Sequence, residues 1–203
     1  MEVQKLDEGV ILIKNILSDD EQLQLWADIK SYREGYKATP ARNAKSNFTK
    51  IMAVSSKKLK KPIPETFHSY SDRVANIAHT SSPTIPEKYG IDYITSFSYP
   101  VEGGKLVGHC DKVVGWVVLF SLGCSANFFV KTKNINKKFE FESGDALIFN
   151  GGSQYNVFHG ITSIVPDSCP THFMLEDDLQ SNRVYIQFRQ TVLNEHYYSS
   201  KKY

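Results

Sequence analysis

The second half of this chain consists of short apolar runs with turn-forming residues between them, and this pattern limits the fold more than any other feature. From residue 92 onward, Gly, Ser, Asn and Asp separate runs at 94–99, 116–122, 127–130, 146–149, 155–158 and 184–188. Many short strands divided by turn signals are typical of a β-sandwich or jelly roll. We therefore expect a mainly β core over residues 92–191.

Two helices are expected before this β region. Ser18 and Glu21 have the spacing of a capping box, which predicts a helix that runs to about Tyr32. Pro64 suits the start of a second helix, because apolar residues recur at three and four positions after it. The fold class is therefore α+β, mainly β, with N-terminal helices that buttress one sheet. A length of 203 residues with 41% hydrophobic content favours a single domain, residues 1–203.

The apolar runs and the cysteines limit the compartment. Residues 10–13 and 116–120 are far shorter than the ~20 residues that cross a bilayer, so we expect no membrane partner. Acidic residues precede the first apolar run, unlike a secretion signal, and the three cysteines lack a Cys-x-x-Cys spacing. We expect an intracellular protein, nuclear or cytoplasmic, with reduced thiols and in monomeric form.

Positive charge is concentrated in one segment. Ten basic residues lie between Lys30 and Lys61 against a single acid, Glu34. Such a stretch, with aromatic and Asn residues among the cations, is the composition of a surface that contacts phosphates and stacks bases. On charge alone, a solvated lysine-rich loop fits equally well.

A possible metal site is formed by His109, Asp111 and His159. On an extended strand His109 and Asp111 point to the same face, so they can bind one ion together. His159 closes the expected strand 155–158, and a jelly roll can bring it to the same mouth. Two His and one carboxylate form the facial triad of non-haem iron oxygenases, although His159 taken singly is more often a structural histidine.

An alternating pattern near the end of the chain predicts an anion site. Arg183, Tyr185, Gln187 and Arg189 share one strand face, while Val184, Ile186 and Phe188 share the other. A buried guanidinium is costly unless it meets an anion, and a dicarboxylate supplies two such groups. The alternative is a salt bridge within the protein.

The combined order of these motifs resembles the AlkB family of Fe(II)/2-oxoglutarate dioxygenases. The likeness comprises His109-Cys110-Asp111, then Phe158-His159-Gly160-Ile161, then Arg183 with five residues before Arg189. The likeness extends to residues 141–153, and to the segment in which Tyr99-Pro100 leads through Lys105-Leu106 to His109. Residues 8–12 and 64–78 also have counterparts in the family. It covers residues 8–191, which is nearly the whole chain.

The resemblance implies a double-stranded β-helix fold and an oxidoreductase that uses Fe(II), 2-oxoglutarate and O2. His109, Asp111 and His159 would be the iron ligands and the catalytic centre. Tyr99 and Arg183 would bind the distal carboxylate of 2-oxoglutarate, with Tyr185 in the same pocket and Arg189 beside the metal. The implied reaction is oxidative demethylation of an N-methylated base in DNA or RNA.

The resemblance also implies a substrate-recognition lid at residues 35–62. A flipped base would stack on Tyr36 or Phe48, with flanking phosphates held by Lys57, Lys58, Lys60 and Lys61.

The sequence departs from the family pattern at three positions. Phe97 and Tyr185 replace two asparagines of the cosubstrate pocket, and Val113 replaces an acid that helps to recognise a cationic methylated base. The same oxygenase chemistry on a protein or small molecule therefore remains an alternative. A non-catalytic nucleic-acid-binding jelly roll is another.

Overall fold

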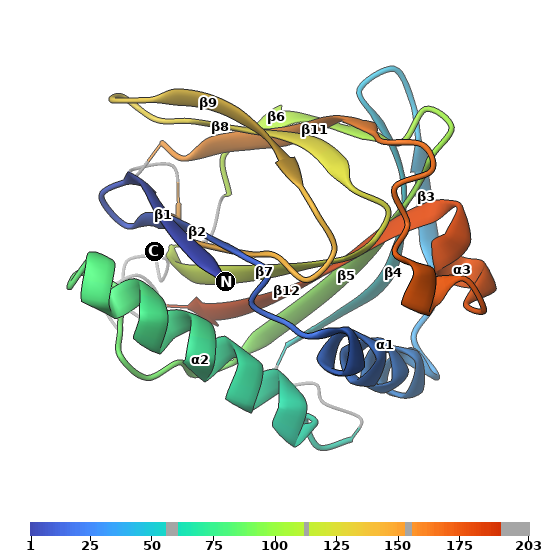
Figure 1. Ribbon diagram of the computed structural model, residues 1–203, viewed down its shortest axis with the longest axis horizontal. Coiled ribbons are helices and arrows are strands. Elements are labelled where there is room, and N and C mark those ends of the chain that lie inside the picture. Colours follow the sequence, from blue (N-terminus) through green and yellow to red (C-terminus); the bar gives the residue numbers. More distant parts are fainter. Residues whose placement is uncertain (56–60, 112–113, 153–155, 192–203) are drawn as a thin grey trace, which may run out of the picture.

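Two facing β-layers and two long helices form the computed structural model of this chain (Figure 1). It describes residues 1–55, 61–111, 114–152 and 156–191. The helices are α1 (Asp19–Arg33), α2 (Glu65–Ser81) and the short α3 (Asp177–Gln180), with a 3-10 turn at Thr171–Phe173. None of the helices in these ranges is long and apolar enough to span a membrane.

The larger layer contains the order β1-β2-β10-β7-β12-β5-β4, and β3 pairs with β4. Its strands are β1 (Glu2–Asp7), β2 (Val10–Lys14), β3 (Thr39–Arg42), β4 (Ser46–Ser55), β5 (Tyr93–Pro100), β7 (Gly115–Gly123), β10 (Ala146–Gly151) and β12 (Asn182–Thr191). Neighbouring strands in this layer are antiparallel. Helices α1 and α2 cover the side of this layer that faces away from the smaller one (Figure 1).

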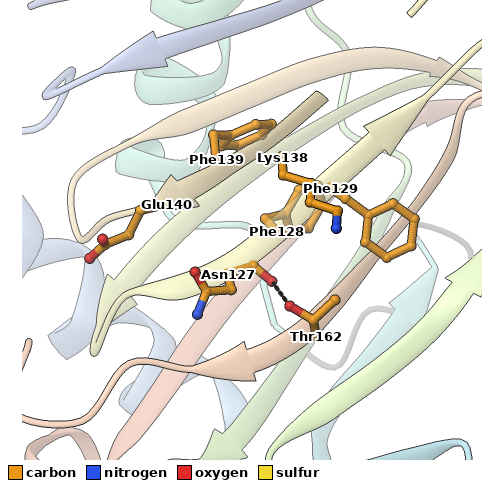
Figure 2. A pocket seen from close by; sticks show the side chains of 7 residues that line it. All are labelled: Asn127, Phe128, Phe129, Lys138, Phe139, Glu140 and Thr162. Carbon is orange, nitrogen blue, oxygen red and sulfur yellow. Dashed lines mark hydrogen bonds between the residues drawn. The ribbon is translucent and has the colours of Figure 1, made fainter. Parts of the chain in front are cut away.

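The smaller layer continues the same path as β6-β11-β8-β9. These strands are β6 (Lys105–His109), β11 (Phe158–Ile164), β8 (Ala126–Lys131) and β9 (Asn136–Phe141). Strand β4 joins the two layers because it pairs with both β5 and β6. A shallow hollow of about 260 Å³ lies over β8, β9 and β11 and is bordered by Phe129, Lys138 and Thr162 (Figure 2).

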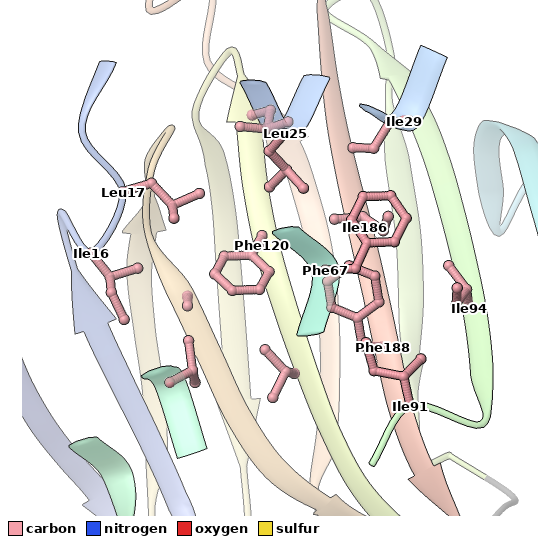
Figure 3. Packing of buried hydrophobic residues seen from close by; sticks show 14 of the residues in the cluster. Ile16, Leu17, Leu25, Ile29, Phe67, Ile91, Ile94, Phe120, Ile186 and Phe188 are labelled. Atoms are coloured by element: carbon pink, nitrogen blue, oxygen red, sulfur yellow. The ribbon is translucent and has the colours of Figure 1, made fainter. Parts of the chain in front are cut away.

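Two apolar clusters lie on opposite sides of the larger layer. The first fills the space between the helices and the sheet, where Leu25 and Phe67 meet Phe120, Ile186 and Phe188 (Figure 3). The second lies between the two layers and includes Tyr99, Phe128, Phe141, Phe149 and Tyr185. The structure thus confirms the mainly β jelly roll with buttressing helices. The side chains of the second cluster point into the barrel, between its two layers.

Local signals explain the two predicted helices. The Ser18 hydroxyl accepts from the Glu21 backbone amide at 3.3 Å, and the Glu21 carboxylate accepts from the Ser18 amide at 2.9 Å. This reciprocal capping box confirms the predicted start of α1. Pro64 directly precedes α2, where the missing proline N–H costs nothing.

Two segments differ from the sequence-based expectation. His159 is the second residue of β11, whereas the expected strand began at Tyr155 and was closed by His159. The sequence after His159 has no apolar run, but it still pairs with β6 on one side and β8 on the other. Within the expected substrate-recognition lid at residues 35–62, residues 39–42 and 46–55 are paired strands, and β4 is an internal strand of the barrel. The described part of the expected lid therefore forms part of the barrel wall.

Candidate active site

Three potential metal ligands converge at the open end of the barrel. His109 ends β6, Asp111 follows two residues later, and His159 lies on the adjacent strand β11, paired with His109. One ligand atom from each residue lies within 4.8 Å of the others. The ring centroids of His109 and His159 are 4.6 Å apart. The structure thus brings the three residues predicted from sequence to one point, which we call the triad.

Backbone hydrogen bonds orient both imidazoles toward that point. His109 Nδ1 lies 3.2 Å from the Val107 carbonyl, and His159 Nδ1 lies 3.0 Å from the Val157 carbonyl. Because a carbonyl only accepts, each Nδ1 carries the proton and donates. The Nε2 lone pairs of both rings are then available for an ion, as in metal-binding histidines generally.

Asp111 is positioned by an arginine of the last strand. Arg189 donates to Asp111 Oδ1 at 2.8 Å, while Asp111 is 8% exposed. Its second oxygen, Oδ2, is buried and has no hydrogen-bond partner among the described residues. A buried carboxylate oxygen without a partner is costly unless a cation fills the position.

Burial keeps His159 neutral. The pKa of His159 is lowered to about 4, mainly by burial, although the Asp111 charge acts in the opposite direction. Phe149 and Phe128 enclose the ring, with centroid distances of 4.8 and 6.1 Å. A neutral imidazole is the form that binds a metal.

A second buried group lies deeper in the barrel. Arg183 is 0% exposed, and its Nε and both terminal nitrogens have no hydrogen-bond partner among the described residues. The guanidinium lies between two rings, 5.2 Å from the centroid of Phe141 and 5.5 Å from that of Tyr185. Burial lowers the pKa of Arg183 to about 10, so it remains charged at neutral pH.

Two tyrosine hydroxyls lie beside this guanidinium. The Tyr99 hydroxyl is buried next to that of Tyr185 without a well-formed hydrogen bond, and the two rings stack at 5.7 Å. Burial raises the pKa of both phenols well above the usual value, so both remain neutral donors. The unsatisfied cation and the phenols fit a bound carboxylate, and the triad fits a divalent ion.

Aromatic rings replace amides around this pocket, as the sequence predicted. Phe97 packs on Tyr185 with ring centroids 5.0 Å apart, and Phe48 packs on Phe97 at 5.1 Å and on Tyr99 at 5.5 Å. Phe48 therefore belongs to the wall of the inner pocket. This position differs from the expected place on a lid over the mouth.

The remaining predicted substrate residues do not gather at the mouth. Tyr36 packs on Tyr32, with centroids 6.2 Å apart, in the cluster on the helical side of the larger layer. Lys61 donates to the Ser31 carbonyl and lies 5.4 Å from the Tyr32 ring centroid. Lys57, Lys58, Lys60 and Val113 lie outside the described residues.

One basic segment near the triad was missed by the sequence analysis. Residues 131–138 contain four lysines and no acid. The segment spans the end of β8, its turn and the start of β9, and the side chains of Lys131 and Lys133 border a hollow beside Cys110 and Phe158. The absence of acids in this run was the available signal. The sequence analysis instead assigned phosphate binding to the larger basic cluster at residues 30–61.

Comparison with known proteins agrees with this geometry. The family model described as "2OG-Fe(II) oxygenase superfamily" matches residues 9–189. Two Arabidopsis thaliana proteins, DNA N(6)-methyladenine demethylase ALKBH1D and ALKBH1C, are 40% identical over 76 residues and 42% identical over 77 residues. Each match covers 36% of this chain and spans only 17% of the length of the relative.

Solved structures share the whole fold. OsALKBH1 superimposes with a TM-score of 0.75 at 25% identity, covering 92% of this chain and 100% of that one. A Pseudomonas putida prolyl-4-hydroxylase has a TM-score of 0.58 at 12% identity, covering 92% of this chain and 94% of that one, and shows the fold alone.

Proposed function

Because this chain belongs to the 2OG-Fe(II) oxygenase superfamily, we propose that it oxidatively demethylates N-methylated bases in DNA or RNA. The superfamily uses Fe(II), 2-oxoglutarate and O2. The names of the two Arabidopsis thaliana relatives support a methylated base as the target, with N6-methyladenine as the first candidate. We assign residues 1–203 to one catalytic domain, with its core at residues 92–191.

The assignment of residues follows from their orientation. His109, Asp111 and His159 would hold the iron through the two Nε2 atoms and a carboxylate oxygen. Arg183 and Tyr99 would bind the distal carboxylate of 2-oxoglutarate, and Tyr185 would flank it. Arg189 fixes the orientation of Asp111 through the 2.8 Å contact with Oδ1.

The observation that carries this proposal is the charged, buried Arg183 without a partner among the described residues, in the same barrel as the triad. A structural arginine would be expected to pair with a protein carboxylate. This one faces the space between the two layers, which is where a dicarboxylate would neutralise it.

The chemistry follows from the bound groups. Fe(II), 2-oxoglutarate and O2 together supply the oxidant for a C–H bond, and the protein contributes orientation and exclusion of water. The net reaction converts 2-oxoglutarate, O2 and an N-methyl base into succinate, CO2, formaldehyde and the unmethylated base.

The test is a panel of oligonucleotides. Single-stranded and duplex DNA and RNA carrying N6-methyladenine, or another N-methylated base, are incubated with Fe(II), ascorbate and 2-oxoglutarate and analysed by mass spectrometry. We expect loss of the methyl group together with succinate formation. Succinate formation with no oligonucleotide consumed would favour a protein or small-molecule substrate, and no succinate with any substrate would favour a non-catalytic role.

A further inference from the structure

An aromatic and basic groove lies on the outer face of the smaller layer, behind the triad. Near the mouth it is a hollow of about 500 Å³. This hollow is lined by Cys110, Lys131, Thr132, Lys133, Asn156 and Phe158. Farther from the mouth is the hollow of Figure 2, which includes Phe129 and Lys138. The rings of Phe129 and Phe158 connect the two, with centroids 5.8 Å apart. We call this surface the outer groove.

The outer groove is adjacent to the triad along two strands. Cys110 stands between His109 and Asp111, and Phe158 directly precedes His159. Because successive residues of an extended chain point to opposite faces, the groove lies on the reverse side of the segments that hold the triad. A polymer that delivers one base to the mouth has its neighbouring nucleotides within reach of this rim.

Two glycines form the floor of the groove. A Cβ atom at Gly108 would lie 2.2 Å from the Phe158 ring, and one at Gly160 would lie 2.9 Å from the Phe129 ring. Both rings therefore rest directly on the backbone of β6 and β11. Phe158 remains 39% exposed, which leaves part of an aromatic surface open to solvent. Such surfaces stack nucleic-acid bases without sequence preference.

Positive charge borders the same rings. Lys131 and Lys133 are exposed beside Phe158. Lys138 is exposed beside Phe129 together with Glu140, so the excess of positive charge lies in the hollow nearest the triad. Among the described residues, none of these three lysines forms an ion pair. Unpaired cations next to an exposed ring are the combination with which proteins bind single-stranded nucleic acid.

We propose that the outer groove binds the nucleotides that flank the methylated base of a single-stranded DNA or RNA substrate. Phe158 stacks on a flanking base, and Lys131 and Lys133 contact the phosphates on either side of it. This inference rests on the proposed function and adds to it a path for the polymer. It also moves the expected phosphate contacts from residues 57–61 to the β8–β9 hairpin.

Binding without turnover tests the proposal. The full chain, loaded with Fe(II) and 2-oxoglutarate under anaerobic conditions, is titrated into a fluorescein-labelled single strand of about ten nucleotides that carries the methylated base, and Kd is measured by anisotropy at several salt concentrations. Parallel titrations with a DNA strand and an RNA strand show which of the two nucleic acids the groove binds. We expect a Lys131→Ala/Lys133→Ala variant to lower the slope of log Kd against log salt by about 1.4, at about 0.7 per lysine.

The aromatic contact has its own variants. Phe158→Ala should weaken binding by at least about fivefold, whereas Phe158→Tyr, which keeps the ring, should bind like the wild type. Lys88→Ala and Leu175→Ala are matched controls, because both residues are exposed and lie outside the groove. Equal thermal stabilisation by 2-oxoglutarate in all variants shows that the barrel is intact.

Failure of this inference differs from failure of the proposed function. If the wild type binds and demethylates the strand while the groove variants keep its Kd and salt slope, the groove is not part of the substrate path. If the wild type forms succinate but neither binds nor demethylates any strand, both the groove and the nucleic-acid function are rejected.

Discussion

At the residue scale, the environment of Arg183 is the strongest indication of an anion-binding pocket. Its guanidinium is fully buried between Phe141 and Tyr185 and has no hydrogen-bond partner among the described residues. We therefore expect Arg183→Met to leave the ligand-free protein equally stable or up to about 2 kcal/mol more stable, because an uncompensated charge is removed. The variant should also lose the stabilisation by 2-oxoglutarate, which is about 2.7 kcal/mol at a hundredfold excess over Kd.

Thermal and denaturant unfolding with and without 2-oxoglutarate measure both quantities. Lys88→Met is the matched control, since it removes an exposed charge elsewhere. A variant that unfolds several kcal/mol more easily and is still stabilised by 2-oxoglutarate would show that Arg183 has a structural partner instead.

Tyr99 provides a finer test of the same pocket. Its hydroxyl is buried beside Arg183 and Tyr185. Tyr99→Phe keeps the ring that packs on Phe48 and removes one donor to a charged ligand, a bond worth about 1.5–3 kcal/mol. We expect the Kd for 2-oxoglutarate, measured by anaerobic calorimetry, to rise about tenfold or more with unchanged protein stability. An unchanged Kd would place the carboxylate elsewhere.

At the scale of elements, a buried ion pair fixes β2 to the turn before β10. Lys14 lies 2.8 Å from Asp145 and 2.9 Å from Glu142, and Asp145 is 0% exposed. The Asp145 carboxylate also accepts from the backbone amides of Asn15 and Glu142, both at 2.9 Å. We expect Lys14→Met to cost about 3 kcal/mol of unfolding free energy at neutral pH, because it leaves a buried charge unpaired.

The sign of the pH dependence follows from Asp145. Burial raises the pKa of Asp145, and Lys14 opposes that rise. Without Lys14 the folded-state pKa should lie further above its unfolded value, so folding takes up a proton and the variant gains stability as the pH falls through this raised pKa. Urea unfolding of the wild type and of Lys14→Met across the acidic pH range checks this. The unfolding free energy of the variant should approach that of the wild type as the pH falls, and a difference that does not shrink would contradict the prediction.

The strands differ in how well the sequence predicts them. β7 and β10 have long apolar runs, because both of their faces are buried between the helical layer and the barrel interior. β5 and β12 are also largely buried, but they include buried polar residues such as Ser96 and Gln187. The smaller layer has one solvent-facing side, so β9 and β11 contain exposed Lys, Thr and Ser and gave no apolar run. Their boundaries were therefore missed, although His159 was still identified.

For the whole molecule, the candidate active site was predictable from sequence, because only a few residue types can bind a metal ion or a buried anion. Two His and a carboxylate, followed by alternating arginines, identify the triad and the anion pocket even though β6 and β11 are remote in sequence. The proposed outer groove was not predictable from charge, because lysines occur on any exposed surface at little energetic cost. Only the fold reveals that Lys131 and Lys133 lie beside Cys110 and Phe158, near the triad, while Tyr36 lies on the helical side of the larger layer.

The central claim is that the triad holds an iron that works with 2-oxoglutarate bound at Arg183. The most direct measurement is succinate and formaldehyde formation from a methylated oligonucleotide under air, with the iron content of each chain determined in parallel. The wild type should bind one iron per chain and form both products in equal amounts, whereas Asp111→Ala should bind little iron and form neither. Equal turnover by Asp111→Ala and the wild type would contradict the account.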